Sequence, residues 1–193
     1  MKKKLRISFN APVVLGFSLI CFLVTLLGIV TKGRSTEAFF MTYRASLKNF
    51  FTYVRFFTHI FGHADWAHFM GNASMILLLG PMLEEKHGST KLAEIIAVTA
   101  LVTGIVNYFL FPNVALCGAS GVAFAFILLT SFTDFREGEI PITFILVAII
   151  YLGQQVNDAL VVRDNISNMA HIVGGAVGAV FGYMLNKKSK YRN

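Results

Sequence analysis

Two residues whose side chains can carry out acyl transfer stand far apart in this sequence of 193 residues. Ser120 lies in the run Gly118-Ala119-Ser120-Gly121, where small neighbours leave the hydroxyl open to a substrate. His171 could take the proton of that hydroxyl as a general base if folding brings the two side chains together. The pair indicates a serine nucleophile, although Ser120 could also serve only as the cap of a helix.

A glycine stripe follows His171 and suggests how the two residues meet. Glycines at positions 174, 178 and 182 recur every four residues, and such small-residue stripes permit close contact between helices in a membrane. We therefore expect this helix to pack against the glycine-flanked start of the Ser120 helix. A single histidine in a membrane helix can also act as a proton relay or form a structural hydrogen bond, and the stripe alone does not decide between these roles.

A second polar pair could stabilise negative charge. His68 and Asn72 are four residues apart and so lie on one face of a helix. Together with the backbone N–H of Ser120 they could donate hydrogen bonds to an oxyanion. The alternative is structural, with Asn72 bonding only to a neighbouring helix.

The elements that must position these residues are membrane helices. The chain is 55% hydrophobic and only 14% charged, which is too apolar for a soluble domain of this length. Most of its apolar stretches approach the ~17 to 25 residues that span a bilayer. They predict an all-α, polytopic membrane protein of six transmembrane helices, from approximately Ala11 to Thr31, Ala67 to Leu83, Leu92 to Phe111, Gly118 to Phe132, Ile140 to Leu152 and Met169 to Leu185.

Basic residues predict the orientation of this bundle. The net charge is +7, but the cations flank hydrophobic runs, so we read them as topology signals and expect no nucleic-acid partner. The positive-inside rule favours a single membrane domain over 1–193 with both basic termini, 1–10 and 187–193, in the cytoplasm. The stretch 32–66 is then a long external loop, which carries basic residues as an exception to that rule. The first apolar run is too long for the ~7 to 15 residues of a signal-peptide core. We expect a cell (inner) membrane location.

The same orientation predicts the depth of the site. The second, fourth and sixth segments all run inward, so His68, Ser120 and His171 begin their helices near the outer face. The fourth segment, of about fifteen residues, spans only roughly 22 Å at 1.5 Å per residue, against a hydrocarbon core of ~30 Å. Ser120 should therefore lie below the outer surface, after a non-helical stretch from Pro112 to Cys117.

Taken together, these motifs resemble those of the rhomboid intramembrane serine proteases. The matching motifs occur in the family's order on the second, fourth and sixth helices, with two further similarities in the external loop and after the second helix. They are His68-x-x-x-Asn72, Gly118-x-Ser120-Gly121, Ala170-His171-x-x-Gly174-x-x-x-Gly178, Arg55-Phe56-Phe57-Thr58-His59 and Glu84-Glu85-Lys86-His87-Gly88-Ser89.

This resemblance implies a hydrolase that cleaves transmembrane or juxtamembrane segments of membrane proteins with a Ser120 and His171 dyad and no aspartate. It also implies an oxyanion site from His68, Asn72 and the Ser120 N–H. The family needs no metal or organic cofactor, and its substrates are single-span proteins that reach the site beside the fifth helix. Further supporting positions carried over from the family are Phe124, Gly118, Gly121, Gly174 and Gly178 at the dyad, Arg55 in the loop and Glu84 at the turn after the second helix.

Two positions depart from the family pattern. Phe124 stands where the family commonly has a tyrosine, which keeps the ring against the catalytic imidazole and removes the hydroxyl. Val54 replaces a tryptophan before Arg55, which concerns the packing of the loop.

Three other classes of protein compete with this interpretation. A zinc protease is suggested by His59 and His63, but Ile60 occupies the position of the glutamate in H-E-x-x-H, and loop hydrogen bonds are the alternative role for these histidines. A transporter would need paired ionisable groups in its interior. A rhomboid-like protein without protease activity would be favoured by the loss of a dyad residue, and both are present. Cys21 and Cys117 give no reason to expect a disulfide.

Overall fold

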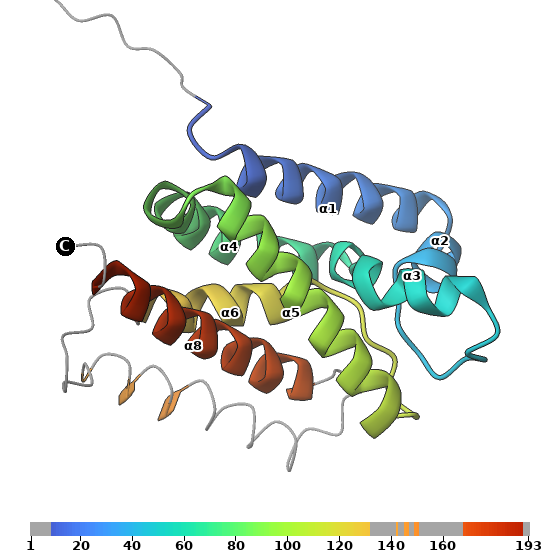
Figure 1. Cartoon of the computed structure of the whole chain (residues 1–193). Helices are drawn as coiled ribbons and strands as arrows, with labels where there is room; N and C mark the ends of the chain where they lie inside the picture. The colour runs from blue at the N-terminus through green and yellow to red at the C-terminus, as the bar shows by residue number, and fades with distance from the viewer. Residues whose placement is uncertain (1–8, 132–141, 143–144, 147–148, 151–167, 191–193) are drawn as a thin grey trace, which may run out of the picture.

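The computed structural model describes residues 9–131, 142, 145–146, 149–150 and 168–190 (Figure 1). The predicted fifth segment, Ile140 to Leu152, falls largely outside these residues, as do the outermost residues of both basic termini. The described elements are α1 (Pro12–Val30), α2 (Arg34–Phe39), α3 (Phe50–Thr58), η1 (His59–Phe61), α4 (Trp66–His87), α5 (Ser89–Leu110), α6 (Ser120–Ser131) and α8 (Asn168–Lys190). The all-helical prediction agrees with this part of the chain, which contains one isolated β-bridge, between Thr42 and Leu116.

Two of the described helices, α1 and α5, are long and apolar enough to cross a membrane by length and composition. The apolar part of α6 is shorter, as the sequence predicted for the fourth segment, and so is the apolar part of α8. The helix ends agree with the predicted segments to within a few residues, except that α4 and α8 each continue into polar sequence at their C-terminal ends.

Glu84 joins the start of α1 to the turn between α4 and α5. Its buried carboxylate accepts hydrogen bonds from the backbone N–H groups of Val13 and Val14, both at 3.0 Å, and from the Ser89 hydroxyl at 2.7 Å. These amides belong to the first turn of a helix, where N–H groups lack partners within the helix. The expected role of Glu84 at this turn is confirmed, and the same side chain also caps α1.

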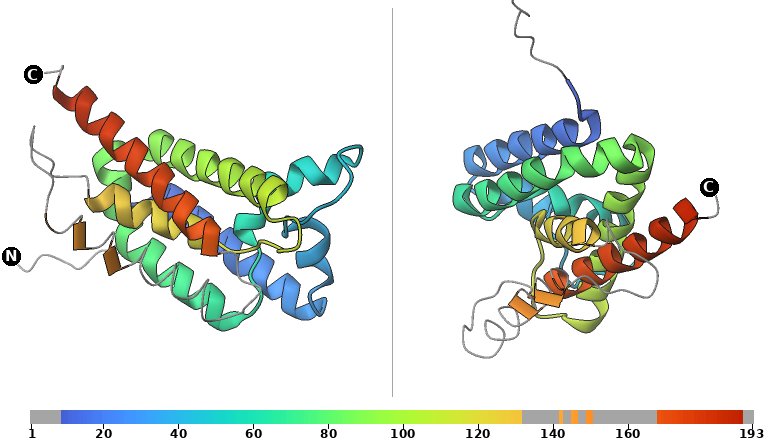
Figure 2. Two further views of the ribbon diagram at one scale, coloured as in Figure 1. Left: turned by 90° about the horizontal axis from the view of Figure 1, so that it is seen from below. Right: turned by 90° about the vertical axis from the view of Figure 1, so that its left-hand side faces the viewer.

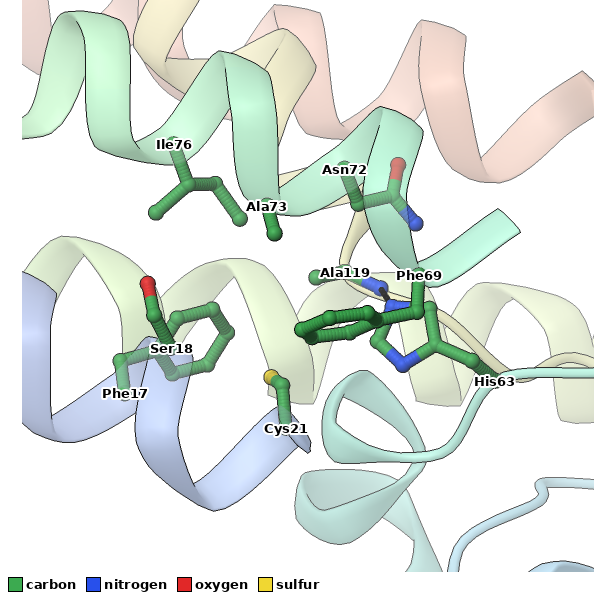
Figure 3. Close-up of a pocket in the computed structure, with 9 residues that line it drawn as sticks. All are labelled: Phe17, Ser18, Cys21, His63, Phe69, Asn72, Ala73, Ile76 and Ala119. Atoms are coloured by element: carbon green, nitrogen blue, oxygen red, sulfur yellow. Dashed lines mark hydrogen bonds between the residues drawn. The ribbon is translucent and has the colours of Figure 1, made fainter. Parts of the chain in front are cut away.

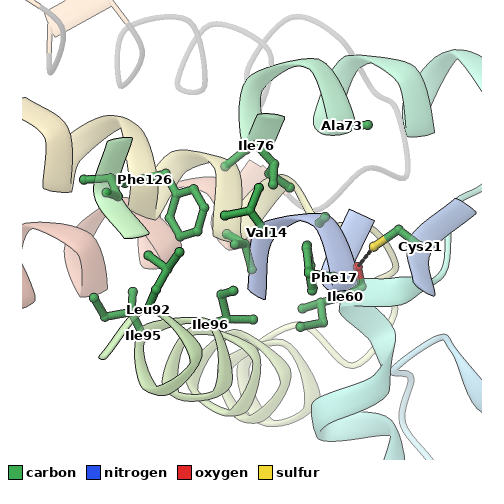
Figure 4. Packing of buried hydrophobic residues seen from close by; sticks show 14 of the residues in the cluster. Val14, Phe17, Cys21, Ile60, Ala73, Ile76, Leu92, Ile95, Ile96 and Phe126 are labelled. Carbon is green, nitrogen blue, oxygen red and sulfur yellow. Dashed lines mark hydrogen bonds between the residues drawn. The ribbon is translucent and has the colours of Figure 1, made fainter. Parts of the chain in front are cut away.

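The helix α6 lies at the centre of the bundle, and every residue from Ser120 to Leu129 except Phe124 is buried. The apolar core forms where α1, α4, α5 and α6 meet, with Val14, Ile76, Leu92 and Phe126 in contact across it (Figure 4). A short α6 can reach this position because the non-helical stretch 111–119 carries the chain to it from the end of α5.

The helix α8 packs along α6 through glycine and alanine (Figures 1 and 2). A Cβ added at Gly174 would lie 2.2 Å from the backbone oxygen of Gly121, and one at Gly178 would lie 2.1 Å from that of Ala125. No side chain fits between backbones at that separation. The predicted packing of the glycine stripe against the start of the Ser120 helix is therefore confirmed, and we call this contact the glycine seam (Gly121, Ala125, Gly174 and Gly178).

The segment between α1 and α4, predicted as a long loop, is partly helical and well packed. It contains α2, α3 and η1, and the side chain of Asn49 caps α3 by accepting the Phe51 N–H at 2.9 Å. Arg55 is buried, donates to the Ala38 carbonyl at 3.2 Å and lies 4.4 Å from the ring of Tyr43. The structural role implied for Arg55 is thus confirmed. Helices of six and nine residues, such as α2 and α3, are too short for an apolar pattern to separate them from loop in the sequence.

Candidate active site

Ser120 is the first residue of α6 and is 8% exposed. The two residues before it form a tight turn whose amides are held by the segment 59–63. The Gly118 N–H donates to the backbone oxygen of His59 at 2.9 Å, and the Ala119 N–H donates to Nε2 of His63 at 3.4 Å. Gly118 has φ +122°, a conformation that residues with a Cβ rarely adopt. The expected non-helical approach to the serine is confirmed, and we name residues 118–120 the nucleophile turn after the role that the sequence predicts for Ser120.

His171 lies in the first turns of α8, beside the same end of α6. Its imidazole stacks on the ring of Phe124, with centroids 4.5 Å apart and planes 1° from parallel. Phe124 is one helical turn beyond Ser120, and Gly121 between them lies against both Ala170 and Gly174. The residues on either side of His171 along α8 therefore contact the residue next to Ser120, which brings the imidazole to the end of α6 that carries the serine.

His68 and Asn72 reach the nucleophile turn from α4. A Cβ added at Gly118 would lie 2.8 Å from Nε2 of His68 and 3.6 Å from Nδ2 of Asn72, so only a glycine leaves room for both side chains. The Nδ2 of Asn72 is buried and has no hydrogen-bond partner among the residues that the structure describes. A buried donor without a partner is costly in a folded protein, and at a functional site it is available to a substrate.

The close-up of this region shows Asn72 and His63 on opposite sides of the backbone at Ala119 (Figure 3). The gap that extends from them between α1 and α4 is too narrow to hold a water molecule. Its wall is otherwise mostly apolar and includes Phe17, Cys21 and Phe69. Cys21 and Cys117 are both free thiols.

His59 and His63 form hydrogen bonds through all four of their ring nitrogens. Nδ1 of His59 lies 3.1 Å from the Arg55 oxygen and Nε2 lies 3.2 Å from the Thr103 hydroxyl. Nδ1 of His63 lies 3.3 Å from the Thr25 hydroxyl, and its Nε2 accepts from Ala119. These contacts fit the alternative of hydrogen-bonding histidines better than a zinc pair.

Burial also keeps these two imidazoles neutral. The loss of hydration lowers the pKa of His59 and of His63 from 6.5 to about 4. The neighbouring His68 lowers the pKa of His63 further, whereas Asp65 raises it. A neutral imidazole has one donor and one acceptor nitrogen, which matches the partners of His63: acceptors beside Nδ1 and the Ala119 N–H beside Nε2.

The contact between His63 and Ala119 is the part of the site that the sequence did not predict. It joins residues 56 positions apart. The only signal at His63 in the sequence was its four-residue spacing from His59, and His68 and Asn72 have the same spacing, so this signal did not single out His63. Of the residues that the sequence singled out, His68 and Asn72 lie beside Gly118, and His171 stacks on Phe124, one helical turn beyond Ser120.

Comparison with known proteins identifies relatives over the larger part of the chain. The family model for the rhomboid domain matches residues 51–188. Rhomboid-related protein 1 of Caenorhabditis elegans is 28% identical over 140 residues, which cover 68% of this chain and 39% of the relative. Rhomboid protease GlpG of Haemophilus influenzae is 28% identical over 140 residues, which cover 70% of this chain and 71% of the relative. Rhomboid-related protein 2 of Mus musculus is 30% identical over 142 residues, which cover 67% of this chain and 47% of the relative. The matched regions thus amount to less than two thirds of several relatives' lengths.

Proposed function

The chain belongs to the rhomboid family, and from this premise we propose that it is an intramembrane serine endopeptidase whose nucleophile is Ser120 and whose general base is His171. Rhomboids are membrane proteins, and the family is known for intramembrane proteolysis. The substrates we propose are transmembrane or juxtamembrane segments of other membrane proteins, with the lipid bilayer as the surrounding solvent.

The proposed reaction begins with the attack of Ser120 Oγ on a peptide carbonyl carbon of the substrate. His171 takes the hydroxyl proton and passes it to the leaving amine, so that the peptide bond breaks and an acyl-enzyme ester remains. Water then attacks the ester, His171 accepts its proton, and the proton returns to Ser120 as the acid product leaves. Each step is balanced without a metal or cofactor.

The oxyanion formed in each attack is assigned to three donors. These are the Ser120 N–H, the Nδ2 of Asn72 and the imidazole of His68. Preorganised donors aimed at a developing charge usually contribute a large part of enzymatic rate enhancement. The buried Nδ2 of Asn72 lies beside Gly118 without a partner in the described part of the chain, which supports this assignment.

The single observation that carries the proposal is the contact between α6 and α8 at the serine. Gly174 lies against Gly121 with no room for a Cβ, and the His171 imidazole stacks on Phe124 from the same helix as Ser120. This contact brings together the helices that carry Ser120 and His171, about 50 residues apart in sequence, and so supports the proposed dyad.

We further propose the topology that the chemistry requires. The single domain over 1–193 would cross the bilayer six times, with both termini in the cytoplasm of a cell (inner) membrane and residues 32–66 outside. The nucleophile turn would then lie below the external surface. The buried amides of Gly118 and Ala119 support this depth, because both are satisfied by protein rather than by solvent.

Cleavage by the reconstituted protein tests this function. The purified chain would be placed in vesicles with a single-span model substrate, and wild type compared with Ser120→Ala and His171→Ala. We expect cleavage by wild type only, with both variants still folded by circular dichroism. Equal cleavage by all three proteins would remove the dyad, and substrate binding without cleavage by wild type would indicate a non-proteolytic rhomboid.

A further inference from the structure

His63 connects four separate parts of the molecule through one buried ring. It is 4% exposed and lies between η1 and α4. Its Nδ1 faces the Thr25 hydroxyl of α1 and the Phe61 carbonyl, and its Nε2 faces the Ala119 N–H. The ring also packs at right angles to that of Phe69, at 5.5 Å. No step of the proposed reaction uses this histidine.

The partners of His63 select one tautomer. The Thr25 hydroxyl donates its own hydrogen to the Cys21 carbonyl at 2.7 Å, so toward Nδ1 it can only accept. The Phe61 carbonyl, 3.2 Å from Nδ1, is also an acceptor. Nδ1 must therefore carry the hydrogen, which leaves the lone pair on Nε2, where the Ala119 N–H requires an acceptor.

The peptide held by His63 directly precedes the proposed nucleophile. Gly118 N–H is bonded to the oxygen of His59 and Ala119 N–H to His63, so two successive amides of the turn point toward the segment 59–63. The next amide is that of Ser120, the proposed backbone donor to the oxyanion. Fixing the plane of one peptide constrains the direction of the next, because only two dihedral angles separate them.

We propose that His63 is a positioning residue of the protease reaction: its Nε2 holds the Ala119 peptide and thereby aims the Ser120 amide, while Thr25 and Phe61 fix the tautomer that makes this possible. This inference rests on the proposed function. The role differs from packing alone because it depends on an acceptor at one point of the ring, and small displacements of a catalytic group can cost up to about a hundredfold in rate.

Two amide substitutions separate positioning from packing. His63→Gln places an amide oxygen close to the location of Nε2 and can still accept from Ala119. His63→Asn is one methylene shorter, so it can reach Thr25 and Phe61 but not Ala119. Both variants lose the aromatic ring, and we expect them to lose similar thermal stability. For His63→Gln we expect kcat within about threefold of wild type, and for His63→Asn a kcat lower by about tenfold to a hundredfold with KM nearly unchanged.

The measurements are kcat and KM for a single-span substrate in vesicles, together with the melting temperature of each variant. Equal kcat values for the two variants, or a kcat that falls in step with melting temperature, would overturn the inference while the wild-type activity stands. If wild type neither cleaves nor reacts at Ser120, the proposed function fails and this role of His63 fails with it.

A spectroscopic measurement tests the tautomer without relying on activity. The ¹⁵N spectrum of histidine-labelled wild type, assigned by comparison with His63→Gln, should show a protonated Nδ1 and an unprotonated Nε2 at neutral pH. A protonated Nε2 would contradict the hydrogen bond from Ala119 and overturn the inference even if both amide variants were unfolded.

Discussion

The two sides of Ser120 are built in opposite ways. Toward α8, the glycine seam allows two backbones to touch because no side chain lies between them. A Cβ added at Gly174 would lie only 2.2 Å from the Gly121 oxygen. Toward the segment 59–63, the nucleophile turn is held by directed hydrogen bonds, from the Gly118 N–H to the His59 oxygen and from the Ala119 N–H to Nε2 of His63. Ser120 lies between the glycine seam and the contacts that hold the nucleophile turn.

The two regions control different quantities: the distance between α6 and α8, and the direction of the Ser120 amide. Repulsion between atoms rises steeply, so the seam fixes how closely the His171 helix approaches and tolerates no larger residue. Hydrogen bonds depend on where a donor or acceptor lies, so the turn fixes the direction of the Ser120 amide and tolerates a polar replacement of similar reach. Substitutions in the two regions should therefore fail in different ways.

The largest effect is expected in the seam. Gly174→Ala puts a Cβ within 2.2 Å of the Gly121 oxygen, so α6 and α8 must separate and carry His171 away from Ser120. We expect kcat/KM for a reconstituted substrate to fall about a hundredfold, with a loss of roughly 1 to 3 kcal/mol in the free energy of unfolding.

Gly175→Ala is the matched control for that substitution. Its added Cβ would meet only the Leu128 side chain, at an ordinary contact distance of 3.4 Å. Activity and thermal stability should stay close to wild type. If Gly174→Ala were as active as Gly175→Ala, the seam would not set the distance between the dyad residues.

The next largest effect is expected in the nucleophile turn. Gly118→Ala combines a φ of +122° with a Cβ only 2.8 Å from Nε2 of His68, so it disturbs both the backbone and the proposed oxyanion site. We expect kcat to fall by about tenfold to a hundredfold. Assays of cleavage at saturating substrate would measure this.

Gly88→Ala separates backbone strain from damage to the site. Gly88 also has a positive φ, of +83°, but open space surrounds its Cβ position and it lies at the turn between α4 and α5. We expect it to cost about 1 to 3 kcal/mol of stability through strain and to leave kcat unchanged. If Gly88→Ala and Gly118→Ala lost kcat to a similar extent, backbone strain alone would explain the effect of Gly118→Ala.

Acid should weaken the polar side of the site but not the seam. The pKa values of His59 and His63 are lowered from 6.5 to about 4 by burial, so the unfolded chain binds more protons than the folded one between these pH values. Their contribution to the free energy of unfolding is complete above pH 6.5 and is lost as the pH falls toward 4. The residues of the seam do not titrate.

Thermal unfolding in detergent micelles across this pH range would measure the effect. His63→Gln should show a smaller decrease in melting temperature on acidification than wild type, because the contribution of the His63 imidazole is absent. An identical pH dependence in both proteins would contradict the assignment of the effect to His63.

The smallest effect is expected from Phe124→Tyr. The ring that stacks on His171 at 4.5 Å is preserved, and only a hydroxyl is added. We expect kcat/KM to be raised or to stay within about threefold of wild type, which corresponds to well under 1.36 kcal/mol in the activation free energy. Complete loss of activity would show that the added hydroxyl cannot be accommodated beside the imidazole.

The sequence predicted what depends on periodicity and local motif. The apolar runs gave the positions of the main described helices, the four-residue glycine spacing gave the seam, and the short fourth segment gave a serine at the start of α6. These features are encoded within one stretch of chain or in one repeated spacing. A long-range seam could be inferred because only glycine-rich faces can approach so closely.

The sequence did not predict what depends on the path of irregular chain. α2 and α3 are short and were read as loop, and the bond from Ala119 to His63 joins two non-helical segments. Helices of six and nine residues are too short for an apolar pattern to separate them from loop, and no sequence pattern marks the contact between Ala119 and His63. In the sequence, His63 stood out only through its four-residue spacing from His59. That spacing fits a pair of zinc ligands as well as two histidines that form hydrogen bonds, so it did not reveal the contact with Ala119.

The most direct test of the central claim is the labelling of Ser120 by a serine-directed fluorophosphonate, mapped by peptide mass spectrometry in the wild type, His171→Ala and Ser120→Ala proteins. We predict a label on Ser120 in wild type, no label in Ser120→Ala, and labelling at least about a hundredfold slower in His171→Ala. Equal labelling rates in wild type and His171→Ala, or a label on another residue, would contradict the claim that the seam joins these two side chains into one catalytic unit.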